Sequence, residues 1–358
     1  MNLLYLGSHS VLEFDQVRMW SRLGIDVFSI GAYTNPHEPE GSLRPAIPEA
    51  TDHPDLRGFV HDKRVEHLAH DAGYPVIDWA KYDLHPEIVA WADTVLVDCY
   101  PESWIPANWE RLRGKRVIWR TIGQSGPQTE QRMALYRSQG LEIVRYSPRE
   151  KFAFERAGAF AGEDTIIRFS KDPADWGGWI GDNLVVGNLA QHDTVPHGRD
   201  DFLSWPYLTE VTEGLDLVFG GPNSEKVGGL GALTYTQMQN FLCHLRAFVC
   251  TGTAPASYTL GLMEAMMTGT PTIAMPLGMG WTSANQLFFD LYEASDIVDQ
   301  GIIATIDVRR FLRRLIEDPR EAAAVSYAGR ARAIDLFSED KIREQWAAYL
   351  GVRVEVAA

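Results

Sequence analysis

The feature that most constrains the fold is a regular alternation of buried strands and amphipathic helices along the first half of the chain. Strand-like runs occupy residues 2–6, 25–31, 93–100, 115–123 and 141–147, and helical patterns occupy residues 11–23, 85–92, 106–114, 129–140 and 147–158. Ser147 precedes the last helix and can cap it. This alternation is typical of βαβ units, which build parallel sheets.

The alternation dissolves between residues 168 and 182 and then begins afresh. Strands are expected at 183–190, 215–221, 247–252 and 271–278, and helices at 199–211, 234–245, 284–295, 307–318, 319–337 and 338–351. We interpret the break as an inter-domain boundary, because it contains Pro, Gly and Trp without periodicity. The sequence therefore predicts two doubly wound α/β domains, residues 1–175 and 176–335, followed by a C-terminal helix at 336–358.

Composition narrows the class of partner and the compartment. The chain of 358 residues has a net charge of −15, and a generic nucleic-acid surface would need clustered Lys and Arg. Its three cysteines have no metal-ligand spacing, which favours free thiols in a reducing compartment. Neither a basic leader nor an apolar run of about 18 residues occurs. We expect a cytoplasmic protein without a transmembrane segment.

The stretch TAPASYTLGLMEAMMTGTPTIAM, residues 253–275, carries the strongest chemical signal. A helix that begins near Leu260 would present unpaired N–H groups and the positive end of its dipole, which together bind anions. Ser257, Tyr258 and Thr259 could add hydroxyl donors, and Gly261 leaves room for close approach. Glu264, about one turn in, could accept hydrogen bonds from sugar hydroxyls. The plainer alternative is that the hydroxyls cap the helix and Glu264 is solvated or paired with an Arg.

The order FVCTGTAPASYTLGLMEAMMTGTPTIAM resembles the donor-site region of GT-B glycosyltransferases, especially the retaining family 4 group. The resemblance covers roughly residues 183–350 well and the N-terminal domain only in layout. It implies two Rossmann-like domains with a nucleotide-sugar site between them, and a last helix that crosses back to the first domain. By this resemblance, Glu264 holds the donor ribose, and the backbone of Tyr258, Thr259 and Leu260 cradles the diphosphate. No cofactor or metal is implied, since the nucleoside-diphosphate sugar is a co-substrate.

Two positions depart from the family pattern. The first acid of the motif, eight residues before the second, falls on Ala256, which leaves the donor sugar undetermined. The family's Arg and Lys-Gly after the first strand of the second domain are not intact, because the chain runs GNLAQHDTVPHGRDD there. Asn188 ends that strand, and Arg199 or Lys226 could supply the positive charge. These three residues complete the set of donor-binding candidates.

The N-terminal domain contributes candidates at the ends of its strands, where ligands of doubly wound folds bind. Gly7 and Ser8 form the turn after the first strand. The catalytic candidates are His9, Asp98, Arg120 and Gln124. His9 could act on an acceptor hydroxyl or be a locally satisfied turn residue, and Arg120 is the candidate for a buried charge near a diphosphate. No catalytic base is assigned, because Gln124 stands roughly where the family often has a His.

The sequence predicts a glycosyltransferase that moves a sugar from a nucleoside diphosphate to a hydroxyl acceptor, retaining and metal-independent. Residues 6–35 faintly resemble glycosyltransferase-like proteins of phages and environmental viruses, so hydroxymethylated DNA bases are one alternative acceptor. A degenerate GT-B protein that binds a nucleotide or glycan without turnover is another alternative, and a sugar-nucleotide epimerase a third. A nicotinamide-dependent enzyme is disfavoured, because neither domain opens with a glycine fingerprint. Trp281 is a candidate for stacking on a sugar ring.

Overall fold

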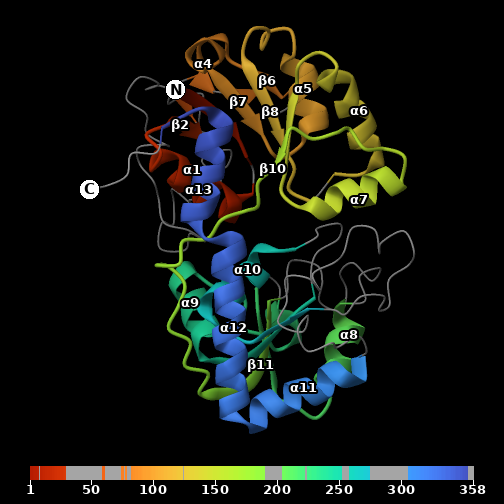
Figure 1. Ribbon diagram of the computed structural model, residues 1–358, viewed down its shortest axis with the longest axis vertical. Helices are drawn as coiled ribbons and strands as arrows, with labels where there is room; N and C mark the ends of the chain where they lie inside the picture. Colours follow the sequence, from red (N-terminus) through yellow and green to blue (C-terminus); the bar gives the residue numbers. More distant parts are fainter. Residues whose placement is uncertain are drawn as a thin grey trace. The chain divides into compact units, whose positions relative to one another are not determined.

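The computed structural model describes residues 1–7, 9–29, 59–60, 74–75, 77–78, 82–123, 125–189, 204–221, 224–251, 258–274 and 305–353. The chain divides into two compact units. The first unit comprises Met1–Ser170 together with Asp340–Ala358, and the second comprises Lys171–Glu339. Each unit contains a parallel sheet with helices on both faces (Figure 1). The helix expected at 284–295 lies outside the described residues.

The first unit is built on a six-stranded parallel sheet in the order β10-β9-β8-β7-β1-β2. Its strands are β1 (Asn2–Leu6), β2 (Asp26–Ser29), β7 (Thr94–Val97), β8 (Arg116–Arg120), β9 (Glu142–Arg145) and β10 (Thr165–Ile166). Two short two-stranded sheets pair β3 (Phe59–Val60) with β4 (Tyr74–Pro75), and β5 (Ile77–Asp78) with β6 (Asp83–Leu84). The helices of this unit are α1 (Ser10–Ser21), α4 (Pro86–Trp91), α5 (Pro101–Asn108), α6 (Pro127–Arg137), α7 (Pro148–Arg156) and α13 (Glu339–Leu350).

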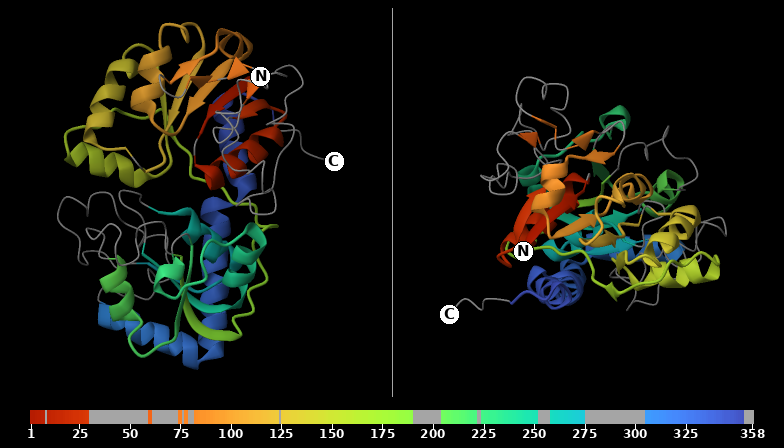
Figure 2. Two further views of the ribbon diagram at one scale, coloured as in Figure 1. Left: turned by 180° about the vertical axis from the view of Figure 1, so that it is seen from behind. Right: turned by 90° about the horizontal axis from the view of Figure 1, so that it is seen from above.

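Alternate residues of each strand bury on opposite faces of this sheet, as the two-residue period of a strand requires. In β1, Leu3 and Tyr5 pack in one cluster with α1 and α13, whereas Leu4 and Leu6 pack in another with α4, α5 and α6. The near-continuous apolar sequence of β1 follows from this two-sided burial. The views of Figures 1 and 2 both show α1 and α13 side by side on one face.

Local signals start several helices where the sequence places them. The Ser147 hydroxyl accepts the Arg149 N–H at 3.1 Å at the start of α7, which confirms the predicted cap. The helix expected at 106–114 is wrong in its bounds, since α5 spans Pro101–Asn108 and contains Pro106. Pro106 lacks the N–H that would reach Glu102, and the Arg132 guanidinium donates to that carbonyl at 3.3 Å instead.

The second unit is built on a four-stranded parallel sheet in the order β12-β11-β13-β14. Its strands are β11 (Asn183–Leu189), β12 (Leu217–Gly220), β13 (Leu245–Cys250) and β14 (Thr272–Ala274). Its helices are α8 (Ser204–Val211), α9 (Tyr235–His244), α10 (Leu260–Thr268), α11 (Thr305–Glu317) and α12 (Pro319–Phe337), with a 3-10 turn at Ser224–Val227. Side chains of α8, α11 and the start of α12 pack with those of β11, β13 and β14. Helix α10 packs against α9 and α12.

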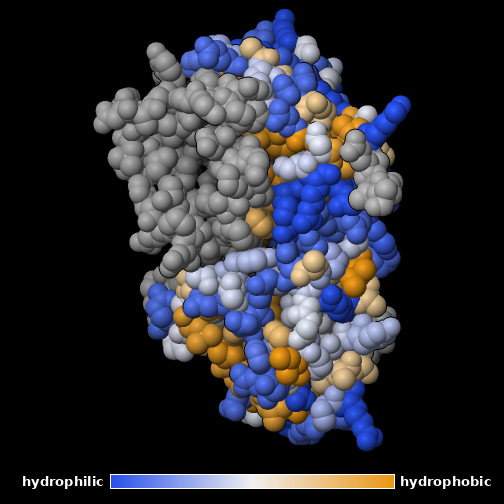
Figure 3. All heavy atoms as spheres, turned by 90° about the vertical axis from the view of Figure 1, so that its left-hand side faces the viewer, coloured by the Kyte–Doolittle hydropathy of each residue, from blue (hydrophilic) through white to orange (hydrophobic). Residues whose placement is uncertain are grey.

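Large apolar side chains on the surface include Leu135, Phe152, Ile180 and Tyr327. On the face drawn in Figure 3, the coloured hydrophobic residues form separate small patches among hydrophilic ones. Among the helices that the structure describes, none is both long enough and apolar enough to cross a membrane.

Candidate functional site

Strand order locates the binding crevice of each unit. In doubly wound sheets, ligands bind beyond the carboxyl ends of the strands, at the point where the chain reverses its direction across the sheet. In the second unit this point lies between β11 and β13, because β12 is added on one side of β11 and β13 on the other. Helix α10 follows β13 and begins at the same edge.

The start of α10 is anchored to the end of β13. The Thr259 hydroxyl accepts the Leu262 N–H at 3.3 Å and lies 3.5 Å from the Cys250 Sγ atom. The Tyr258 ring is buried against Phe337, with 5.2 Å between ring centroids. These contacts fix the helix start, and the first turn of a helix carries N–H groups that lack intrahelical partners. The geometry therefore suits an anion at Leu260 and Gly261, although Thr259 also serves as a cap, as the plainer interpretation expects.

Asn188 lies at the carboxyl end of β11, and its side-chain amide nitrogen bonds to other protein groups. Its amide nitrogen donates to the Val249 carbonyl at 2.8 Å and lies 3.5 Å from the Thr251 hydroxyl. The side chain is 3% exposed and links the ends of β11 and β13. Among the residues that the structure describes, a Cβ atom added at Gly261 would contact Leu189 at 3.4 Å, an ordinary van der Waals distance.

Glu264 is buried in α10 and forms an ion pair that the sequence does not reveal. Its Oε1 atom lies 2.6 Å from the Nζ atom of Lys171, and the two side chains are 4% and 0% exposed. The sequence suggests a sugar ligand, solvent or an Arg as its partner. Lys171 lies in the segment 168–182, which we interpret from the sequence as an inter-domain boundary. It is the single lysine of that segment, and no other sequence feature marks it as a partner of Glu264.

Several expected residues lie outside what the structure describes. These are Ser8, Gln124, Arg199, Ala256, Ser257 and Trp281. Lys226 lies in the 3-10 turn, but its side chain is outside the description. The candidate donor residues that the structure brings to one edge are thus Tyr258, Thr259, Leu260, Gly261, Glu264 and Asn188.

In the first unit the chain reverses between β1 and β7, which brings Gly7, His9 and Asp98 to one crevice. His9 caps α1, because its Nδ1 atom accepts the Leu12 N–H at 3.4 Å. A Cβ atom at Gly7 would lie 2.6 Å from the Tyr5 ring, so glycine is needed for the ring to pass beneath the turn.

Asp98 is a buried carboxyl group in this crevice. The Tyr5 hydroxyl donates to its Oδ2 atom and accepts from the Gln16 amide at 3.1 Å. Burial raises the pKa of Asp98 to about 6, against the hydrogen bonds from Tyr5 and Cys99 and the charge of Arg120, which lower it. Asp98 therefore changes its charge near neutral pH, which suits a group that exchanges a proton.

Arg120 is fully buried, but protein groups surround it. Its guanidinium donates to the carbonyls of Ile167 at 2.9 Å and Arg168 at 3.2 Å, and it lies over the rings of Phe169 and Trp346. These contacts hold the last segment before the second unit, together with α13.

Glu150 is a further buried acid that the sequence does not single out. The Thr121 hydroxyl donates to its Oε2 atom and accepts the Tyr146 N–H at 3.2 Å. Burial raises the pKa of Glu150 to about 7, although the nearby charge of Arg145 lowers it. In the described residues, no group of three or more His, Cys, Asp or Glu side chains is placed to hold a metal ion.

The sequence matches no protein-family model and no curated protein. Solved structures do match. A sucrose-phosphate synthase from Thermosynechococcus elongatus is 12% identical with a TM-score of 0.65, covering 98% of each chain. HepE of Anabaena, solved in complex with UDP-glucose, is 13% identical with a TM-score of 0.60, covering 98% of this chain and 99% of that one. A glycosyltransferase from Rickettsia africae is 10% identical with a TM-score of 0.57, covering 97% of each chain.

These likenesses extend over almost the whole chain and therefore include both parallel sheets and the helices that cover them. The expectation of two doubly wound α/β units is confirmed by the strand orders. This chain has the GT-B fold.

Proposed function

We propose that the chain is a glycosyltransferase that transfers a sugar from a nucleoside diphosphate to a hydroxyl acceptor. The observation that carries the proposal is the start of α10, a fixed helix N-terminus at the crevice of the second unit, with the buried acid Glu264 in its second turn. The fold that this chain shares with sugar-transferring enzymes supports the same activity.

The proposed donor complex uses two parts of this helix. The diphosphate binds the N–H groups of Leu260 and Gly261, where the dipole favours negative charge. The ribose hydroxyls donate to the carboxylate of Glu264, whose two oxygens together accept several hydrogen bonds and whose Oε1 atom accepts one from Lys171. Because HepE was solved with UDP-glucose, this sugar nucleotide is the first donor to test.

In the proposed reaction, the bond between the anomeric carbon and the β-phosphate oxygen breaks, and the acceptor oxygen bonds to that carbon. We propose retention of configuration, with the acceptor proton passing to the departing phosphate. Charge develops on this phosphate, so the N-terminus of α10 stabilises the transition state more than the ground state. We propose that this stabilisation is sufficient without a metal ion.

Release of nucleoside diphosphate from UDP-glucose, GDP-mannose and ADP-glucose tests this proposal. The purified protein is assayed with water or simple sugars as acceptors, beside Glu264→Gln and the exposed control Glu317→Gln on α11. We expect release from one donor, a loss of at least about tenfold in Glu264→Gln, since a hydrogen bond to a charged group contributes about 1.5–3 kcal/mol, and no change in the control. Binding of a donor without any release would instead show a binding protein without turnover.

A further inference from the structure

Lys171 is held in place by its backbone. Its N–H donates to the Phe337 carbonyl at 2.8 Å, and its carbonyl accepts the Glu339 N–H at 2.9 Å. The residue thereby forms a parallel bridge with Ser338 at the end of α12. Because both the N–H and the carbonyl of Lys171 are hydrogen-bonded, its backbone has a fixed position. The fold therefore restricts where the ammonium group can lie.

The Lys171 side chain forms a buried ion pair with Glu264. It is 0% exposed, its Nζ atom lies 2.6 Å from Glu264 Oε1, and it lies 5.7 Å from the centroid of the Trp176 ring. Trp176 is itself buried and packs edge-on against Tyr235. A charge-assisted hydrogen bond of this length, between two buried side chains, fixes the rotamer of Glu264.

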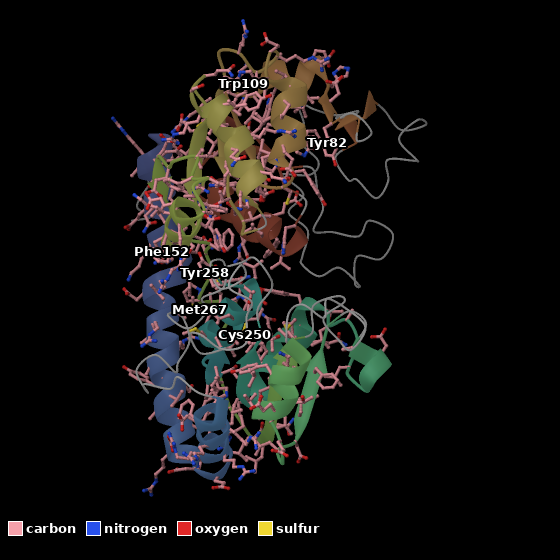
Figure 4. The ribbon with its side chains drawn as sticks, turned by 90° about the vertical axis from the view of Figure 1, so that its right-hand side faces the viewer. Tyr82, Trp109, Phe152, Cys250, Tyr258 and Met267 are labelled. Atoms are coloured by element: carbon pink, nitrogen blue, oxygen red, sulfur yellow. The ribbon has the colours of Figure 1, made fainter. Side chains whose placement is uncertain are left out.

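A second contact holds the same segment to the other end of α10. The Arg330 guanidinium donates to the carbonyls of Trp176 at 2.7 Å, Pro173 at 3.4 Å and Met267. Met267 lies in the last turn of α10 (Figure 4). The segment from Lys171 to Trp176 is therefore attached to α10 near its start and at its end.

Stability alone does not explain the buried pair. Replacing a buried ion pair by apolar residues of similar size is often neutral or stabilising, because desolvation offsets the attraction between the charges. The pair nevertheless lies one turn from the helix start, at the carboxylate to which the donor ribose is assigned. A carboxylate held in one orientation suits the recognition of hydroxyl groups, because hydrogen bonds depend on geometry.

We propose that Lys171 is a positioning residue, which acts through Glu264 to make the site select a ribose over a deoxyribose. This inference rests on the proposed function, since it assigns the ribose to Glu264. Lys171 itself does not touch the donor. It aims the Glu264 carboxylate through their ion pair, so that the ribose hydroxyls meet an acceptor in a fixed position.

Calorimetric binding of UDP, GDP and ADP, each beside its 2′-deoxy counterpart, tests this role. The variants are Lys171→Met, Lys171→Arg, Glu264→Gln, the double variant Lys171→Met/Glu264→Gln and the exposed control Lys151→Met. For the nucleotide that binds best, we expect the wild type and the control to prefer the ribose form by about tenfold or more. Lys171→Met and Glu264→Gln should each reduce this ratio to about threefold or less, and the double variant should reduce it no further.

The ratio separates positioning from mere support of the fold. A structural role would weaken both nucleotides equally and leave the ratio unchanged, which overturns the proposal even if Lys171→Met is less stable. Lys171→Arg should restore part of the ratio, because it keeps a cation there. The double variant removes both charges of the pair and Lys171→Arg keeps a cation, so the ratio is also measured in these two variants if Lys171→Met does not fold.

The two proposals fail in different ways. If the wild type binds none of the six nucleotides, or binds them without preferring ribose, the assignment of the donor to Glu264 is wrong and this inference falls with it. If the wild type prefers ribose, Glu264→Gln loses the preference and Lys171→Met keeps it, only the role of Lys171 is wrong.

Discussion

At the scale of single residues, Arg145 and Glu130 form a fully buried ion pair in the first unit. Both guanidinium ends of Arg145 donate to the carboxylate of Glu130 at 2.6 Å, and both side chains are 0% exposed. Glu130 also accepts the Ala161 N–H at 3.0 Å, and Arg145 donates to the Gly162 carbonyl at 2.9 Å. The hydrogen bonds of this ion pair therefore connect α6, β9 and the loop before β10.

Removing one member of the pair should be costly. We expect Glu130→Ala to lower the free energy of unfolding by about 3–5 kcal/mol, because it leaves Arg145 charged and buried. The control is Glu110→Ala, whose partner Arg113 is 71% exposed, and there a change of less than about 1 kcal/mol is expected. Urea unfolding of both variants measures the difference, and equal losses would contradict the role given to burial.

Two buried acids predict how stability depends on pH. The pKa of Asp98 is raised to about 6 and that of Glu150 to about 7. Because folding raises both values, the unfolded chain releases these protons first, so their stabilisation is complete below about pH 4 and is lost as the pH rises through 6 to 7. A rise of about two units corresponds to about 3 kcal/mol for each group.

We therefore expect the free energy of unfolding to fall between about pH 4.5 and 7.5. The combined variant Asp98→Asn/Glu150→Gln should show a much smaller fall, and urea unfolding across this range compares it with the wild type. An identical pH dependence in the two proteins would show that neither carboxyl group is buried as described.

At the scale of elements, α13 completes the first unit although it lies at the other end of the chain. Trp346 packs edge-on against Trp20 of α1, and Tyr349 donates to Glu142 of β9. Arg116 of β8 binds Glu142 through two nitrogens, at 2.8 and 2.7 Å, and lies over the Tyr349 ring. This helix covers part of one face of the sheet.

The cost of losing this cover can be measured. We expect Trp346→Ala to lower the free energy of unfolding by about 3–5 kcal/mol, because the side chain is 0% exposed. Tyr327→Ala, at a side chain of α12 that is 81% exposed, should change it by less than about 0.5 kcal/mol. A small effect at Trp346 would mean that α13 is not part of the core of the first unit.

Local sequence signals predicted elements better than their limits. The caps at Ser147 and Thr259 are visible in sequence, because a capping residue acts within three positions of itself. The limits of α5 were not predictable from local sequence. Pro106 has no N–H to donate to the Glu102 carbonyl, and the donor that replaces it is Arg132, which is 26 positions from Pro106 in the sequence. A contact of this kind depends on the tertiary fold, which local propensity does not contain.

At the scale of the whole molecule, the alternation of strands and helices predicted two doubly wound units, and the strand orders confirm them. The same topology brings Gly7, His9 and Asp98 to one crevice, and Glu264 to the other. The ion-pair partner of Glu264 was not predictable, because Lys171 lies 93 positions away in the sequence and belongs to no periodic pattern. The sequence thus predicts which edge carries the site, whereas the charge arrangement at that edge requires the structure.

Thermal unfolding with and without UDP-glucose tests the central claim most directly, in the wild type and in Glu264→Gln. A ligand at about 100 times its Kd adds about 2.7 kcal/mol, which is about 5 °C or more for a unit of this size. We predict such a rise in the wild type with UDP-glucose, or with its GDP, ADP or dTDP counterparts, and a much smaller rise in Glu264→Gln. No rise with any of these sugar nucleotides, in a protein that unfolds cooperatively, would contradict a donor site at α10.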